Sequence, residues 1–339
     1  MTVSIGVIGV GMIGQDHIRR LTRVLAGSRV VAVTDVDAAR AAEVAASLPV
    51  PARAHPGGEE LIADPDVQAV IVTSWGPTHE EYVLACIGAG KPVFCEKPLA
   101  TTQEACLRII DAEVAAGRRL VQVGYMRRYD DAYRAMKRVV DSGDIGAPLM
   151  VHSRHRNTSV PEHYTREMAI TDTAVHDFDT VRWLLGEELV SATVITPRPS
   201  RHGGDLQDPL LILLESESGA VVDVETSVNI RYGYDIQGEV VGEDGTVALD
   251  NAAPVLVRRA GTVSGRVPVD WRERFVRAYD VELQEWVDAL ASGQGATGPS
   301  SWDGYAAAAV SDAALEALHS GTKVAIALSD KPDLYAKEG

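Results

Sequence analysis

Cysteine is scarce in this 339-residue chain, which has three such residues. Cys86, Cys95 and Cys106 are an odd number and show no C-x-x-C spacing, which argues against a disulfide framework and a thiolate zinc site. Thiols used in this way are typical of a reducing compartment.

A long apolar run and an excess of basic charge are also absent. No stretch approaches the roughly 20 apolar residues that a membrane-spanning helix needs. Glycines interrupt the apolar start, and its first basic residue is Arg19, which is not the order of a secretory signal peptide. With 32 Lys and Arg against 48 Asp and Glu the net charge is −16, so the surface repels phosphate backbones. We expect a cytoplasmic protein that binds neither membranes nor nucleic acids.

What remains is the composition of an ordinary globular protein, with 46% apolar and 24% charged residues and a length that suggests two domains. In the first third, short apolar runs alternate with helical patterns, which predicts a parallel sheet covered by helices. After about residue 124, alternating runs separated by turn signals predict a mostly antiparallel sheet. The predicted fold is therefore α/β, with one domain over residues 1–124 and a second over residues 125–339.

The predicted elements follow from these patterns. Strands are expected at 3–8, 30–34, 67–73, 92–95 and 120–123, and then at 149–157, 189–195, 210–215, 220–229, 239–243 and 246–250. Helices are expected at 13–25, 38–47, 79–89, 102–116, 129–142, 172–185, 277–291 and 304–319. Loops are expected at 198–209 and 291–301, and no role is assigned to the stretches 198–209 and 251–275.

The strongest local motif is Gly9-x-Gly11-x-x-Gly14, which directly follows a predicted strand and opens a predicted helix. Such glycines allow a tight turn and a close approach of the backbone to a pyrophosphate, which the helix N-terminus attracts. Asp35 ends the second strand, 35 − 14 = 21 residues later, where a carboxylate holds ribose hydroxyls and repels a 2′-phosphate. Together they predict a dinucleotide site that prefers NAD to NADP. Separately, they also fit a structural turn and a capping carboxylate.

A candidate base is needed if such a cofactor oxidises an alcohol, because the hydroxyl proton must be removed. Asp172 and His176 lie four residues apart, which places them on one face of a helix, and a neighbouring carboxylate fixes an imidazole tautomer. His176 is therefore the candidate general base. Lys97, in Glu96-Lys97-Pro98 after the fourth strand, lies at the sheet edge that binds ligands and can donate to the reacting oxygen. Taken alone, Lys97 fits a solvated lysine and the Asp/His pair a helix surface.

A metal site is a second interpretation of the same side chains. Asp172 and His176 could supply two ligands, with His152, His155 or His163 as others. No spacing here matches a standard zinc signature, so we expect no metal.

The glycine motif, Glu96-Lys97-Pro98 and Asp172-x-x-x-His176, in this order and at these distances, resemble the Gfo/Idh/MocA oxidoreductase family over essentially the whole chain. The resemblance implies a Rossmann domain followed by an α/β domain with a large, mostly antiparallel open sheet. In this family the sheet usually packs against a partner subunit, so we expect a homo-oligomer, a dimer of dimers (homotetramer). Within the family the chain is most similar to the bacterial inositol dehydrogenases. The segments that carry this likeness are 73–83, 93–100, 123–130, 152–157 and 232–243.

The resemblance also implies a role for each matching position. The catalytic residues would be Lys97, Asp172 and His176. The substrate would also contact Arg127, His155, Asn157 and Tyr234. The cofactor would be NAD, held by residues of the first domain and by one methionine after it: Gly9, Gly11, Met12, Ile13, Gly14, Asp35, Val36, Thr73, Ser74, Trp75, His79, Glu96, Lys97 and Met126.

The strand pattern is compatible with these substrate residues. A period of two places His155 and Asn157 on one face of their strand, and Tyr232 and Tyr234 on one face in the same way. Arg, His, Asn and Tyr side chains pair well with the many hydroxyls of a polyol. Taken alone, Tyr234 fits a packed sheet residue and Arg127 a surface charge.

The expected reaction is NAD-dependent oxidation of myo-inositol to 2-keto-myo-inositol (scyllo-inosose). His176 would accept the hydroxyl proton, Asp172 would orient His176, and Lys97 would polarise the oxygen. Three alternatives stay open: oxidation of scyllo-inositol, D-chiro-inositol or a pyranose sugar, glycoside cleavage through a transient ketone, and a non-catalytic NAD-binding regulator. The complete catalytic set argues against the regulator. The isomer and the direction of flux stay open.

Overall fold

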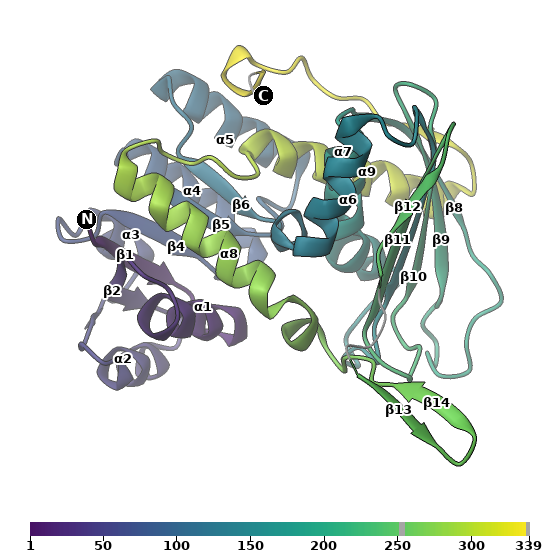
Figure 1. Ribbon diagram of the computed structural model, residues 1–339. Helices are drawn as coiled ribbons and strands as arrows, with labels where there is room; N and C mark the ends of the chain where they lie inside the picture. The colour runs from purple at the N-terminus through teal and green to yellow at the C-terminus, as the bar shows by residue number, and fades with distance from the viewer. Residues whose placement is uncertain (251–254, 337–339) are drawn as a thin grey trace. The chain divides into compact units, whose positions relative to one another are not determined.

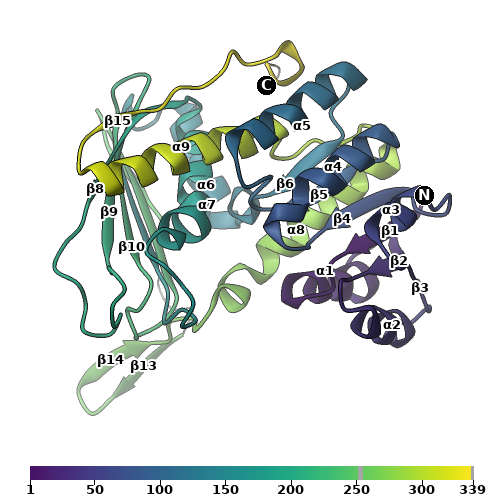
Figure 2. The ribbon, with the colours of Figure 1, turned by 180° about the vertical axis from the view of Figure 1, so that it is seen from behind.

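The computed structural model describes residues 1–250 and 255–336 and is drawn in Figures 1 and 2. It divides into two compact units. Unit 1 contains Met1–Tyr125, Tyr279–Ala308 and residues 329–336, and unit 2 contains the described part of Met126–Ala278 together with Ala309–Leu328. The predicted division at residue 124 is linear, whereas the chain returns twice to unit 1 after leaving it.

Unit 1 is built on a six-stranded parallel sheet in the order β3-β2-β1-β4-β5-β6. The predicted parallel sheet with crossover helices is therefore confirmed. The strands are β1 (Val3–Ile8), β2 (Ser28–Thr34), β3 (Arg53–Ala54), β4 (Ala69–Val72), β5 (Val93–Glu96) and β6 (Val121–Gly124). The helices between them are α1 (Met12–Arg23), α2 (Ala38–Ser47), α3 (Gly58–Ala63), α4 (His79–Gly88) and α5 (Gln103–Ala116), with a 3-10 turn η1 (Gly76–Thr78) before α4.

The strand order creates the edge at which a site is expected. The chain runs outward from β1 to β3 and then returns to β4 on the other side of β1. At such a reversal the connections leave the carboxyl ends of β1 and β4 in opposite directions, which opens a crevice for a ligand. The short β3 and α3 were not predicted, because two and six residues are too few to show a period.

Apolar burial holds this sheet to its helices. The core on one face joins β1 and β2 to α1, α2 and the unit 1 part of α8 (Trp271–Ser292). Ile18 and Leu21 of α1 and Trp286 of α8 are all less than 5% exposed in this core. Burying a large apolar side chain stabilises the fold by about 1.5–3 kcal/mol, so the sheet edge rests on a rigid base. The helix α9 (Ser301–Ser320), like α8, begins in one unit and ends in the other.

Unit 2 is built on a seven-stranded sheet in the order β12-β11-β7-β10-β9-β8-β15. Only β7 and β10 are parallel, so the predicted mostly antiparallel open sheet is confirmed. The strands are β7 (Pro148–Arg156), β8 (Leu189–Ile195), β9 (Leu210–Ser216), β10 (Val221–Ser227), β11 (Asp235–Gly242), β12 (Thr246–Ala248) and β15 (Val324–Ala325). The two-residue β15 was not predicted.

The two faces of this sheet differ. The helices α6 (Asp131–Ser142) and α7 (Val175–Leu185) lie beside one face in both views (Figures 1 and 2). Along β7, Ser153 and His155 are buried on that side, whereas Arg154 and Arg156 alternate with them and are half-buried. Side chains of β7 therefore reach the helices at every second residue, as a strand requires.

The two stretches 198–209 and 251–275 differ in their secondary structure. Residues 198–209 contain no helix or strand. Within 251–275 the chain forms a hairpin of β13 (Leu256–Arg259) and β14 (Thr262–Gly265), all of whose residues are exposed, while 251–254 lie outside the described residues. Figure 1 shows this hairpin extending away from the end of the large sheet of unit 2.

Short irregular helices complete the chain: η2 (Met126–Tyr129), the π-helix η3 (Ala169–Ala174) and η4 (Asp333–Tyr335). The helix predicted over 172–185 is therefore an α-helix from Val175 that follows a wider π turn. Within residues 1–250 and 255–336 no helix is both long enough and apolar enough to cross a membrane.

Candidate functional site

The glycine motif forms the turn between β1 and α1. Gly9 has φ +92°, and a Cβ there would lie 2.6 Å from the backbone nitrogen of Ser74. A Cβ on Gly14 would lie 2.1 Å from the carbonyl oxygen of Gly9. Gly11 differs, because no protein atom lies within 4 Å of where its Cβ would be. Two glycines thus serve the turn, and the third leaves space at the N-terminus of α1, where a pyrophosphate would bind.

Asp35 is anchored beside this turn at the end of β2. Its Oδ2 accepts a hydrogen bond of 2.7 Å from the backbone N–H of Val10, and its Oδ1 accepts one of 2.9 Å from Asp37. The carboxylate therefore has a fixed place next to the glycine motif and remains partly exposed. This geometry suits the predicted ribose contact.

Large apolar side chains lie exposed after three of the parallel strands. Met12 is 67% exposed after β1, Val36 is fully exposed after β2, and Trp75 is 78% exposed after β4. Ile13 and Ser74, beside them, are half-buried. An exposed apolar edge of this kind is a surface that a planar ring system can cover.

Buried groups connect the segment after β4 to the segments after β1 and β5. The Thr73 hydroxyl donates to the carbonyl of Gly9 at 2.6 Å. The His79 ring is 1% exposed and lies between two carbonyl oxygens, 2.7 Å from Pro98 and 3.0 Å from Ser74. His79, which was expected to line the cofactor edge, therefore has a ring that is buried inside the protein beside Ser74 and Pro98. Lys97 follows β5, is half-buried and precedes Pro98 through a cis peptide bond.

In unit 2 a buried polar cluster joins residues that are far apart in the sequence. Asp177 Oδ1 accepts hydrogen bonds of 2.6 Å from both the Arg127 guanidinium and the Ser153 hydroxyl. His155 Nδ1 lies 2.8 Å from Asp177 Oδ2 and 2.8 Å from Arg127 Nη2. Arg127 and Asp177 are each 1% exposed. Arg127 is therefore a buried, paired cation and not a surface charge.

The electrostatics of this cluster are set by the pair. Burial by itself raises the pKa of the Asp177 carboxyl, but the charge of Arg127 and the hydrogen bonds from His155 and Ser153 outweigh burial. The pKa of Asp177 consequently lies well below its ordinary value of 3.8. Burial raises the pKa of Tyr234 to about 12, so its phenol keeps its proton and can donate it to an acceptor.

Tyr234 and His176 lie around His155. The Tyr234 ring packs edge-on against His155 with centroids 5.8 Å apart, and the His176 ring lies 6.4 Å from His155. His176 is half-buried in the first turn of α7, while Asp172 is exposed in the preceding π-helix. The regular helix face expected for Asp172 and His176 is thus replaced by a π-to-α junction, a feature often found at functional sites.

Two pairs of residues were each predicted to share one face of a strand: His155 with Asn157, and Tyr232 with Tyr234. Asn157 directly follows β7, and its backbone N–H donates to Ser227 at 2.8 Å, so it continues the strand that carries His155. The prediction that Tyr232 and Tyr234 lie on one face is wrong. Tyr232 is 52% exposed and Tyr234 is 5% exposed. The residues before β11 do not form a strand, so a period of two does not relate Tyr232 to Tyr234.

Sequence reasoning missed the acidic partners of this region. Asp177 belongs to the cluster, and Asp179 accepts two hydrogen bonds from Arg128, at 2.5 and 3.0 Å. Two adjacent Arg–Asp pairs therefore join η2 to α7. The alternation of Asp177 and Asp179 was a signal, but acidic residues on a helix are usually solvated, and nothing local indicates their partners.

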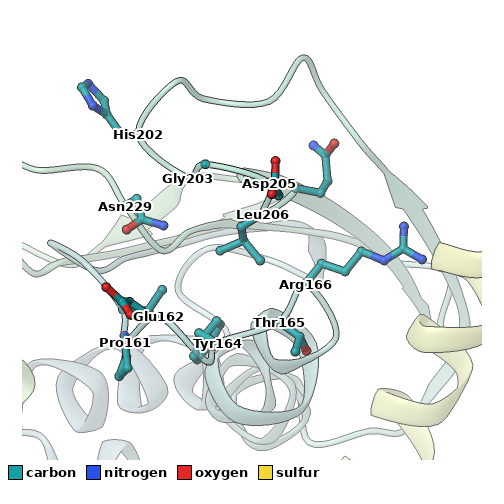
Figure 3. A pocket seen from close by; sticks show the side chains of 13 residues that line it. Pro161, Glu162, Tyr164, Thr165, Arg166, His202, Gly203, Asp205, Leu206 and Asn229 are labelled. Atoms are coloured by element: carbon teal, nitrogen blue, oxygen red, sulfur yellow. The ribbon is translucent and has the colours of Figure 1, made fainter.

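A separate pocket of about 740 Å³ lies in unit 2 (Figure 3). Its lining comes from the segment 160–166, the unassigned loop at 202–207, and Asn229. None of the predicted site residues lines it. The Tyr164 hydroxyl on its wall lies 2.6 Å from the hydroxyl of Thr173, so the pocket adjoins the π-helix that carries Asp172.

The predicted site residues are divided between the two units. Asp172 and His176 lie in unit 2, together with Arg127, His155, Asn157 and Tyr234. Lys97 lies in unit 1 with the glycine motif and Asp35, and Met126 is the buried first residue of unit 2. Across the described ranges, no three or more His, Cys, Asp or Glu side chains are grouped so as to hold a metal ion.

Two family models match the chain. The model of an oxidoreductase family with an NAD-binding Rossmann fold matches residues 3–125. The model of the C-terminal alpha/beta domain of the same oxidoreductase family matches residues 137–326. Both are models of the Gfo/Idh/MocA oxidoreductases.

Individual proteins are similar over the full length. The inositol 2-dehydrogenase 3 of Saccharopolyspora erythraea is 61% identical, over 99% of this chain and 98% of that protein. The inositol 2-dehydrogenase of Burkholderia cenocepacia is 56% identical, over 99% of both. Among solved structures, the myo-inositol dehydrogenase of Lactobacillus casei in complex with NAD(H) and myo-inositol has a TM-score of 0.97 and 41% identity, covering 99% of this chain and 100% of that one.

Loss of the Asp177 charge tests the buried cluster. Asp177→Asn leaves the Arg127 cation buried without its counterion, so we expect the thermal midpoint to fall by about 6 °C or more. Because the folded pKa of Asp177 lies below its unfolded value of 3.8, its stabilisation is complete above that pH and is lost as the pH falls below it. The difference in midpoint between wild type and variant should stay constant from pH 8 to 5 and narrow below about pH 4.

Asp131→Asn is the matched control, since Asp131 pairs with Arg277 at the surface, where both side chains are more than half exposed. Exposed pairs contribute little, so its midpoint should change by less than about 2 °C. Equal midpoints for the two variants, measured by calorimetry at pH 7, would contradict the assigned role of Asp177.

Proposed function

Because the chain belongs to the Gfo/Idh/MocA oxidoreductase family, we propose that it catalyses the NAD-dependent oxidation of myo-inositol to 2-keto-myo-inositol. The observation that carries the substrate class is the buried cluster of Arg127, Asp177 and His155 beside His176 and Tyr234. Fixed donors and acceptors of this kind suit a ring that carries a hydroxyl on every carbon. The likeness to a structure bound to NAD(H) and myo-inositol supports the same choice.

The residues divide into those that react and those that bind. We assign His176 as the base that accepts the hydroxyl proton, Asp172 as the carboxylate that orients it, and Lys97 as the donor to the reacting oxygen. Bound NAD supplies the acceptor for the hydride that leaves the carbon. The alcohol thus loses one proton and one hydride and becomes a ketone. Arg127, His155, Asn157 and Tyr234 are assigned to the remaining hydroxyls.

The cofactor assignment follows the turn between β1 and α1. The space at Gly11 receives the pyrophosphate, and Asp35, fixed by Val10, receives the ribose hydroxyls. The rest of the proposed cofactor site consists of Met12, Ile13, Val36, Thr73, Ser74, Trp75, Glu96 and Met126. His79 supports this site through the contacts of its buried ring with the carbonyl oxygens of Ser74 and Pro98.

The reaction is tested by NAD reduction, followed by absorbance, with myo-inositol as the substrate. We expect turnover in wild type and a loss of about 10²–10⁴-fold in kcat for His176→Ala, because the base is removed. His163→Ala is the control and should keep full turnover, since His163 is exposed. Binding of NAD without its reduction by any inositol isomer would refute the substrate and direct the search to sugars.

The preference for NAD is tested by Asp35→Ser. Removing the carboxylate removes its repulsion of a 2′-phosphate, so the ratio of kcat/KM for NAD to that for NADP should fall about tenfold or more. Asp37→Ser is a matched control two residues away, because Asp37 is exposed and serine also caps α2. A ratio that moves equally in both variants would show that Asp35 does not select the cofactor.

We also propose that the protein is a cytoplasmic homotetramer, a dimer of dimers. Its three thiols, an odd number without a C-x-x-C spacing, are buried, which is typical of a protein from a reducing compartment. On the large sheet of unit 2, the face opposite α7 carries Leu211 and Leu213 beside Arg154 and Glu225, an ion pair of 3.8 Å. A face with apolar side chains and charges of both signs can match a second copy of itself across a two-fold axis.

The tetramer is tested by light scattering. Wild type should have a mass near 4 × 36.3 kDa, which is about 145 kDa. Leu213→Arg introduces an unpaired charge on the proposed face and should at least halve the mass. Val114→Arg, at an exposed apolar residue of α5, should leave the mass unchanged. A wild-type mass near that of one chain would disprove the assembly.

A further inference from the structure

We propose that His17 and His79, two buried histidines of unit 1, hold the segment 96–98 from its two sides and thereby position Lys97. Neither histidine is a catalytic residue, because each acts on the residue next to Lys97. The proposal rests on the assigned role of Lys97, and it adds two positioning residues to that role.

His17 acts on the residue before Lys97. It lies on α1 with a fully buried side chain, and its Nε2 is 2.7 Å from Glu96 Oε1. The other carboxylate oxygen, Oε2, accepts a hydrogen bond of 3.3 Å from the backbone N–H of Lys97. Gly124 of β6 closes the far side, since a Cβ there would lie 3.1 Å from the same carboxyl group. Glu96 therefore has one place, and that place sets the backbone of Lys97.

The His17–Glu96 pair is not explained by stability. Replacing both partners of a buried polar or ionic pair by apolar residues of similar size is often neutral or stabilising, whereas removing one partner leaves the other buried and uncompensated. Burying His17 also has an uncompensated cost, since its Nδ1 is buried and has no hydrogen-bond partner among residues 1–250 and 255–336. Its ring packs edge-on against Phe94 at 5.8 Å, so an apolar side chain would suit its surroundings. What an apolar residue would not supply is the hydrogen bond to Glu96.

His79 acts on the residue after Lys97. It is the first residue of α4, and its Nδ1 lies 2.7 Å from the carbonyl oxygen of Pro98. Its Nε2 lies 3.0 Å from the carbonyl oxygen of Ser74, in the segment after β4. A carbonyl only accepts, so a neutral ring satisfies one of the two contacts and a protonated ring satisfies both. With Nδ1 protonated, the ring donates to the carbonyl of Pro98 and ties it to α4.

The two contacts together constrain the chain on both sides of Lys97, at the peptide bond before it and at the carbonyl of the residue after it. A long side chain places its terminal amine accurately only if its backbone is fixed, and a misplacement of 1 Å can cost about 100-fold in rate. Loss of either histidine should therefore lower kcat by a larger factor than it weakens NAD binding, because the glycine motif and Asp35, which hold the pyrophosphate and the ribose, do not depend on these contacts.

The first experiment compares His17→Leu and His79→Leu with conservative variants. His17→Gln keeps an N–H near the position of Nε2, and His79→Asn keeps one near Nδ1. We expect kcat to fall about tenfold or more in the leucine variants and to recover in part in the amide variants. The dissociation constant of NAD should change by a smaller factor than kcat does, which separates positioning from a general loss of folding.

His55→Leu is the matched control. His55 is also a histidine of unit 1 that contacts a carboxylate, with Nε2 3.0 Å from Asp64 Oδ2, so its carboxylate partner lies outside the segment 96–98. It should keep the wild-type kcat. If His55→Leu lowers kcat as much as His17→Leu does, the effect is structural and the proposal is overturned.

A double-mutant cycle tests whether the histidines act through Lys97. In the Lys97→Ala background, His17→Leu and His79→Leu should each change kcat by less than about twofold, because the group that they position is gone. The same loss in both backgrounds would overturn the proposal.

A readout without substrate separates this proposal from the function on which it rests. The rate at which acetic anhydride modifies Lys97 is measured by mass spectrometry, with Lys137 of unit 2 as the internal reference. The leucine variants should change the relative rate about threefold or more, and His55→Leu should not. A changed rate in a protein that oxidises no inositol would refute the proposed function and support the positioning. An unchanged rate would refute the positioning.

Discussion

The buried pair of Arg127 and Asp177 is the interaction on which the polar interior of unit 2 depends. A charged guanidinium can be 1% exposed only if a counterion meets it, since desolvation of an unpaired cation costs several kcal/mol. Once Asp177 is in place, its remaining acceptor positions hold Ser153 and His155. Tyr234 and His176 then pack around His155. A set of groups that would each be costly to bury alone is thus buried as a connected network, which is rigid for the same reason.

Unit 1 reaches rigidity by other means. Its sheet is almost entirely apolar, and helices such as α1 and α8 bury one of its faces. Polar groups concentrate at the carboxyl edge of the strands, where the glycine motif, Asp35 and the segment 96–98 follow three different strands. Backbone groups make much of this edge, as in the contact of Asp35 with Val10 and of His79 with Pro98. An edge built on backbone atoms keeps its shape while exposed apolar side chains such as Trp75 remain available to a ligand.

Most of the fold could be predicted because its elements are long and its patterns are local. The strand Val3–Ile8 and the helix Ala38–Ser47 have the predicted bounds, and the change from parallel to antiparallel patterning near residue 124 marks where the first sheet ends. The exceptions are physical. The two-residue strands β3 and β15 contain less than one full period, and the exposed hairpin β13–β14 has no buried face to leave an alternating pattern.

The sequence by itself determined the order of strands and helices, the glycine turn, the carboxylate at Asp35 and the residues that resemble a family's catalytic set. These depend on periodicity and on spacings within one turn or strand. Only the tertiary structure decided which polar groups contact each other. Asp177 pairs with Arg127, from which it is separated by 50 residues, and Glu96 contacts His17, from which it is separated by 79 residues. The tertiary structure also decided that Tyr234 is buried while Tyr232 is exposed, because the residues before β11 do not form a strand and so do not alternate with a period of two. The hydrogen-bond partner of a buried polar group is the group that the fold places next to it. The local sequence around either group does not indicate that partner.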